Sequence, residues 1–130
     1  MEKRLAVYNS DSVACIIIKD DGGSCDVLKG CKVRVNKSKH VNIEEGFHSD
    51  FASIPKILSV VGFPKRDPRW DCSGIIHDYL YGKGHKQGVT RAQADRLFFK
   101  ECIYHECSYL RAGLMYIALR LFASKAYNSD

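Results

Sequence analysis

The chain has 130 residues, of which 45% are hydrophobic and 27% are charged, so its composition is that of one folded globular domain and excludes a disordered or fibrous chain. Its net charge of +5 comes from lysines and arginines spread along the sequence, without the dense basic run and interleaved aromatics that predict specific nucleic-acid binding. This charge is compatible with an ordinary solvated surface and also with an anionic partner such as a membrane surface or lipid.

Residues 1–46 have the pattern of strands and turns. Alternating or β-branched runs occur in ACIIIKD (14–20), KVRVN (32–36) and KHVNI (39–43). The turn signals DDGG at 20–23 and the Lys29-Gly30 pair separate these runs. We therefore expect a small antiparallel sheet in the N-terminal part.

Residues 47–69 predict a loop and one short helix. Pro55 stands early in a short apolar run that ends near Gly62, and Ser53 can cap a helix there. Ser49 and Asp50 are alternative caps for the same helix. The prolines in FPKRDPR then predict a loop.

Residues 70–130 predict three helices, which makes the fold class α+β in a single domain over 1–130. The first helix covers 70–82 and ends at Gly82 and Gly84, before a flexible connection, GKGHKQGV. Thr90 and Ser108 are the expected N-caps of the other two. The last, YLRAGLMYIALRLF at 109–122, is too short and too often interrupted by arginine to span a membrane, so we expect a buried core helix.

The six cysteines are expected to remain thiols. MEKRLAVYNSDS at 1–12 lacks the apolar core of a secretory leader, which favours a reducing compartment. Cys25 and Cys31 could still form a bridge across a turn. Cys102, His105 and Cys107 lie close together in CIYHEC, but their spacing is a weak match to a structural zinc site.

The helix at 70–82 carries the most distinctive polar pattern. Ser73, His77 and Tyr81 are four residues apart and share one face, with Asp78 beside that face. In the next helix, Asp95 projects near the apolar stripe, where an unpaired carboxylate would cost several kcal/mol. Its partner is either Arg91 at i−4 or His77, if the two helices pack antiparallel.

A pair of His77 and Asp95 has chemical consequences. A carboxylate on one imidazole nitrogen leaves the other nitrogen as a base that can take a proton from water. Asp78 could then hold a divalent cation that stabilises an oxyanion. His48 and Asp50 are candidates for the rim of such a cleft, with Ser53 and Arg91 as further cleft residues.

The alternative is that these polar groups only lock two helices together. An open cleft above His77 would favour chemistry, whereas burial of His77 under another side chain would favour structure. A Ser-His-Asp nucleophile is a weak match, because the sequence has no G-x-S-x-G elbow.

Four blocks of the sequence resemble a family from bacteriophages and prophages, domain of unknown function 1353. These blocks are GFHSDFASIPKIL, IIHDYLYGKG, TRAQADRLFFKEC and LRAGLMYIALRLF, in the order that the family shows. The resemblance covers about residues 46–122 and leaves the first 45 residues with little of it. It implies a phage-encoded protein and names no activity.

The motifs H-D-x-x-Y and A-D-x-x-F also resemble, more distantly, the catalytic helix pair of phospholipases A2. This resemblance implies that His77 is the general base, Asp78 a calcium ligand, Asp95 the group that orients His77, and Tyr81 a support for Asp95.

Two functions follow as expectations. The first is a metal-assisted, phospholipase A2-like or other hydrolase of ester, lipid or cell-envelope bonds. The second is a non-enzymatic role, as a virion or tail component or as a modulator that binds a host protein. The segment VVGFPKRDPRW favours this second function, because it lacks a glycine-rich calcium loop. Partners would be other virion proteins or a host protein, and the location the host cytoplasm or the virion.

Overall fold

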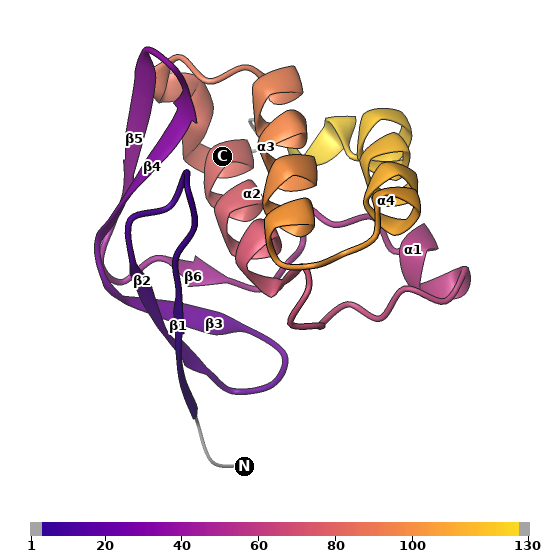
Figure 1. Cartoon of the computed structure of the whole chain (residues 1–130), viewed down its shortest axis with the longest axis horizontal. Helices are drawn as coiled ribbons and strands as arrows, with labels where there is room; N and C mark the ends of the chain where they lie inside the picture. Colours follow the sequence, from indigo (N-terminus) through magenta and orange to yellow (C-terminus); the bar gives the residue numbers. More distant parts are fainter. Residues whose placement is uncertain (1–3, 128–130) are drawn as a thin grey trace. The chain divides into compact units, whose positions relative to one another are not determined.

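The computed structural model describes residues 4–127, which form two compact units that meet in sequence between Asp50 and Phe51. The first unit contains only strands, and the second contains only helices and loops (Figure 1). The expected α+β class, with antiparallel sheet first and helices after it, is confirmed.

The first unit contains two antiparallel sheets. One has the strand order β1-β2-β3-β6, from β1 (Arg4–Tyr8), β2 (Ile16–Asp20), β3 (Cys25–Lys29) and β6 (His48–Ser49). The other is a hairpin of β4 (Cys31–Asn36) and β5 (Lys39–Ile43), joined to the preceding chain by a bridge between Val13 and Val33. The alternation of buried and exposed residues along β2 and β4 explains why both runs form strands with one apolar face.

The expectation of a single small sheet was incomplete. The strands predicted at 14–20, 32–36 and 39–43 are present, but β1, β3 and β6 were missed. In β1 the side chains of Leu5 and Val7 are exposed, and β3 buries only Cys25 and Val27. Short runs with so little alternation carry a weak strand signal.

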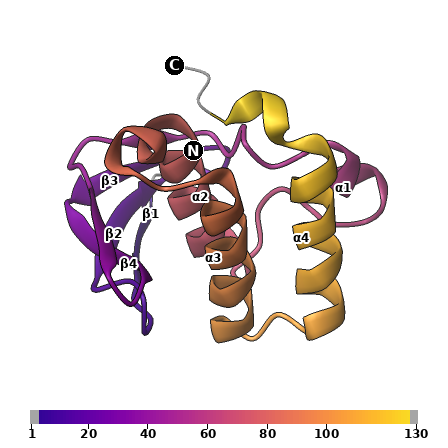
Figure 2. The ribbon, with the colours of Figure 1, turned by 90° about the horizontal axis from the view of Figure 1, so that it is seen from above.

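The second unit has four helices: α1 (Ile57–Val60), α2 (Asp71–Lys83), α3 (Arg91–Tyr104) and α4 (Tyr109–Phe122). Helices α2, α3 and α4 lie side by side and alternate in direction (Figure 2). The predicted caps are confirmed: the side chain of Thr90 accepts from the N–H of Gln93 in a capping box, and that of Ser108 accepts from the N–H of Arg111.

The predicted cap of α1 was wrong. None of Ser49, Asp50 and Ser53 caps α1, which begins after Lys56 without a side-chain cap. Helix α2 ends at Lys83 with Gly84 as its C-cap, in agreement with the predicted end at Gly82 and Gly84. The connection that follows contains a 3₁₀ turn, Gly84–Gln87, which ends at Gly88 with a φ of 82°.

Helix α4 is not the buried core helix that its composition predicts. It buries only Ala112, Met115, Ala118 and Leu119. Its opposite face is a row of exposed apolar side chains, here called the α4 ridge: Leu110, Leu114, Ile117 and Leu121, which are 46–73% exposed. Within residues 4–127, no helix has both the length and the apolar character needed to cross a membrane.

The six cysteines all lie within the described residues, and none forms a disulfide, as predicted.

The space beside Gly74 in α2 is filled by the ring of Phe51. Phe51 is 2% exposed and has a φ of 62°, which is uncommon for a residue with a side chain. A Cβ atom on residue 74 would lie 2.7 Å and 2.9 Å from two carbons of that ring. The glycine therefore lets the chain before α1 pack directly against α2.

Gly74→Ala is expected to lower the free energy of unfolding, although alanine favours a helix over glycine by about 1 kcal/mol. The overpacking against Phe51 costs about 1–3 kcal/mol and outweighs that gain. Gly82→Ala in the same helix is the matched control, because a Cβ atom there meets nothing within 4 Å. Urea unfolding should show that Gly82→Ala raises the free energy of unfolding by about 0.5–1 kcal/mol. Equal stability of Gly74→Ala and Gly82→Ala would contradict the close contact between residue 74 and Phe51.

Candidate functional site

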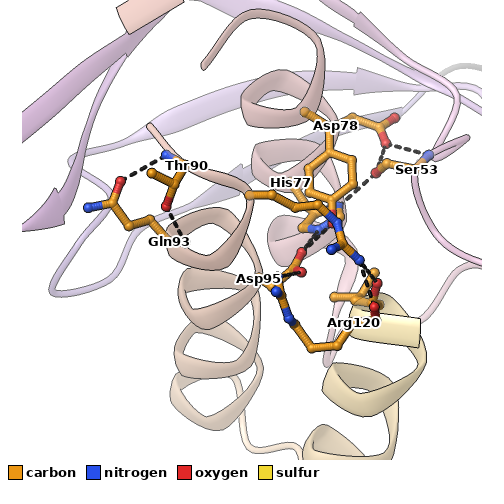
Figure 3. A network of polar contacts seen from close by, with 10 residues as sticks. Ser53, His77, Asp78, Thr90, Gln93, Asp95 and Arg120 are labelled. Carbon is orange, nitrogen blue, oxygen red and sulfur yellow. Dashed lines mark hydrogen bonds and ion pairs between the residues drawn. The ribbon is translucent and has the colours of Figure 1, made fainter. Parts of the chain in front are cut away.

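His77 lies at the centre of a polar network in the second unit. Its side chain is fully buried, with Nε2 2.7 Å from Oδ1 of Asp95 and Nδ1 2.8 Å from Oγ of Ser53 (Figure 3). An ionised carboxylate can only accept, so Nε2 carries the proton that is shared with Asp95. In the neutral imidazole, Nδ1 is then the acceptor nitrogen, and it faces the Ser53 hydroxyl.

Asp95 is fully buried in α3, and three donors surround it. Besides His77, the hydroxyl of Tyr81 donates to Oδ1 at 2.5 Å and the guanidinium of Arg120 donates to Oδ2 at 2.8 Å. Burial alone would raise the pKa of Asp95, but the hydrogen bonds from His77, Tyr81 and Arg120 outweigh burial and hold this pKa below its usual 3.8. Asp95 is therefore an anion that orients His77.

Tyr81 closes one side of the imidazole. Its ring lies over the His77 ring at 3.9 Å between centroids, and Phe98 meets the same imidazole edge-on at 5.4 Å. Burial, together with the hydrogen bond to Asp95, raises the pKa of Tyr81 far above 10. The phenol thus stays protonated and serves as a permanent donor to Asp95.

Ser53 and Asp78 form the end of the network that is closest to solvent. Oδ1 of Asp78 accepts from the backbone N–H of Ser53 at 3.0 Å and also contacts its hydroxyl, whose single proton goes either to Asp78 or to Nδ1 of His77. Ser53 is 6% exposed and Asp78 is partly exposed, in contrast to His77. Asp78 therefore holds the 51–55 segment against α2 and places the Ser53 oxygen beside Nδ1.

The sequence model of the family described as "Protein of unknown function (DUF1353)" matches residues 25–119. The chain belongs to this family. The match begins at β3, so the DUF1353 region extends about twenty residues further toward the N-terminus than the four sequence blocks indicated. No curated protein and no solved structure matches the chain.

Most of the predicted site residues of this DUF1353 chain come together. His77, Tyr81, Asp78, Asp95 and Ser53 form one hydrogen-bonded group.

Arg91 is close to the group but does not fill the predicted role of partner to Asp95. Its guanidinium donates to the carbonyls of Leu119 and Arg120, at 2.7 Å and 2.8 Å, where it interacts favourably with the C-terminal end of α4.

His48 and Asp50 belong to the first unit. Nδ1 of His48 lies 2.6 Å from the carboxylate of Asp26 on the neighbouring strand, and both side chains are exposed. Asp50 is also exposed. Their role at the rim of a His77 site stays a prediction.

Arg120 is the member of the His77 network that sequence reasoning missed. It was treated as an interruption of an apolar helix, although the buried Asp95 needs a partner of opposite charge. The two side chains are 25 residues apart in sequence, and each compensates the other.

The residues around Asp78 do not fit a calcium ion well. Calcium takes six to eight oxygen ligands, and Oδ1 of Asp78 is already occupied by contacts with the backbone N–H and the hydroxyl of Ser53. The loop before α2 carries cations, and these are held in ion pairs, Arg66 with Asp71 and Arg69 with Asp67. Asp78 is thus better suited to positioning Ser53 than to holding a metal.

Proposed function

We propose that this DUF1353 protein is a hydrolase that cleaves an ester or related acyl bond, with Ser53 as nucleophile, His77 as general base and Asp95 as the group that orients the base. The observation that supports it is the unbroken contact from Ser53 Oγ to His77 Nδ1, at 2.8 Å, and from His77 Nε2 to Asp95, at 2.7 Å. A hydroxyl, a base and a third group at these separations are the signature of an activated nucleophile.

In the proposed reaction the Ser53 hydroxyl transfers its proton to Nδ1 as its oxygen bonds to the substrate's carbonyl carbon. The imidazolium is stabilised by Asp95, and it returns the proton to the leaving group when the acyl bond breaks. Water then hydrolyses the acyl-serine by the same transfers, which restores Ser53. None of these steps needs a metal ion.

This proposal replaces water activation by His77, which the phospholipase A2 resemblance implies. The imidazole is fully buried, and the nitrogen that would receive the proton of water already contacts the Ser53 hydroxyl. A hydroxyl that already contacts Nδ1 is therefore a better proton donor to His77 than bulk water.

The substrate class follows from the resemblance to phage proteins and from the basic charge. A phage-encoded hydrolase with a net charge of +5 would act on an ester, lipid or cell-envelope bond of the host, near an anionic surface. It would work in the host cytoplasm or from the virion.

The test is labelling with a fluorophosphonate, which reacts with activated serine hydroxyls, followed by peptide mass spectrometry. We expect one label, on Ser53, and its loss in Ser53→Ala and in His77→Gln. Ser59→Ala in α1 is the control and should label as wild type does. Folded wild-type protein that takes no label on Ser53 would overturn the proposal.

A non-enzymatic role is the second candidate, because two observations favour it. His77 is fully buried, which suits a network that only locks helices, and the α4 ridge leaves a row of apolar side chains exposed. In that case the protein would be a virion or tail component, or would bind a host protein. It would then hydrolyse no ester or lipid, with or without Ca²⁺.

A further inference from the structure

Three side chains of different ligand types converge at a place that shares no residue with the Ser53–His77–Asp95 group. They are Cys72 on α2, Glu101 on α3 and His105 at the C-terminal end of α3, and their ligand atoms all lie within 4.8 Å of one another. Nε2 of His105 and Oε1 of Glu101 are 3.8 Å apart. Cys72 and Glu101 are buried, and His105 is partly exposed.

The end of α3 is built so that His105 lies over Glu101. The two residues are at i and i+4 on one helix face. Beyond the helix, the N–H of Cys107 bonds to the carbonyl of Cys102, and that of Glu106 bonds to the carbonyl of Ile103, which together form a Schellman turn. Glu106 takes a φ of 70° at the position where glycine is usual, a strained conformation of the kind that often marks functional sites.

We propose that Cys72, Glu101 and His105 bind a zinc ion. Thiolate, imidazole and carboxylate are the three ligand types that zinc takes in proteins. A zinc ion about 2 Å from the nitrogen and from the oxygen would hold these atoms roughly 3.3 Å apart in a tetrahedral site. The observed 3.8 Å needs only a small side-chain movement to reach that separation.

The site approaches solvent through His105, which is partly exposed although its Nε2 atom is buried. His105 also lines an open pocket, together with Pro68, Arg69, Tyr104 and Glu106. Three protein ligands with an open fourth position are typical of zinc sites that bind water or a small ligand.

The ligand set differs from the Cys102, His105 and Cys107 cluster that the sequence suggests. The thiol of Cys102 donates to Oγ of Ser73 at 3.4 Å. Cys72, on the neighbouring helix, is the cysteine whose sulfur lies with Glu101 and His105.

The test is titration of the full chain, stripped with a chelator, with Zn²⁺ alone by calorimetry and with Co²⁺ alone by absorption. We expect one ion per chain and the charge-transfer band of a cobalt–thiolate bond. Cys72→Ser should remove that band, and Cys72→Ser and Glu101→Gln should each weaken zinc binding by about 100-fold or more. His105→Gln changes a partly exposed residue, so it tests the site with little effect on folding. It should weaken zinc binding by a similar factor.

Cys15→Ser is the matched control, because Cys15 is an exposed thiol in the first unit that would bind metal nonspecifically. It should leave stoichiometry and affinity unchanged. Absence of zinc binding by the wild type would overturn the proposal. So would binding that survives in both Cys72→Ser and His105→Gln, or binding that disappears in Cys15→Ser.

Discussion

Asp95→Asn is expected to lower the free energy of unfolding by about 3–5 kcal/mol, the usual cost of breaking a buried ion pair from one side. Three donors point at Asp95, from His77, Tyr81 and Arg120, and an amide can neither neutralise the guanidinium nor accept from all three. Urea unfolding at pH 7 measures the loss. Asp67→Asn is the control, because the Asp67–Arg69 pair lies nearer the surface and its loss should cost at most about 1 kcal/mol.

Comparing wild type with Asp95→Asn over a range of pH tests whether the charge of Asp95 stabilises the fold. Because the pKa of Asp95 is lower in the folded state than its ordinary 3.8, its carboxylate adds stability that is fully present above that value. This stability is lost as the pH falls through the folded-state pKa. The gap between wild type and Asp95→Asn should therefore be constant near neutral pH and shrink below pH 3.8. A gap that does not change in acid would show that Asp95 contributes by packing and not by charge.

His77→Gln is expected to lower turnover of an ester substrate by about 10²–10⁴-fold, the usual contribution of a general base. The change removes the nitrogen that accepts the Ser53 proton. The rate is measured on short-chain and phospholipid esters, with near-ultraviolet circular dichroism to show that the variant is folded. His40→Gln, on the exposed face of β5 in the first unit, should keep the wild-type rate.

A double-mutant cycle separates catalysis by His77 from a merely structural role. If Ser53 and His77 act as one unit, adding His77→Gln to Ser53→Ala should lower the remaining rate little further. If the two residues only stabilise the fold, each should lower stability and leave any measured rate per folded molecule unchanged. If the rate loss in the double variant equals the product of the losses in the two single variants, the proposed proton transfer is contradicted.

The sequence by itself determined the features that depend on local chemistry. Thr90 and Ser108 begin their helices because each oxygen accepts a backbone N–H three residues further along. His77 and Tyr81 share a face because four residues make about one helical turn. The need of Asp95 for a partner followed from the cost of burying a carboxylate, and one of its two predicted partners, His77, proved to be the right one.

Only the tertiary structure decided which distant groups complete these local patterns. Ser53 was predicted both as a helix cap and as a cleft residue, and the structure places it against His77 and Asp78, 24 and 25 residues away. Arg120 and not Arg91 neutralises Asp95, because the packing of α4 beside α3 brings the later arginine to the carboxylate. The packing of α4 also leaves the α4 ridge exposed, and the packing of α2 against α3 brings Cys72 to Glu101. Periodicity states which face of a helix is apolar or polar, whereas the element that covers that face is chosen by contacts across the whole unit.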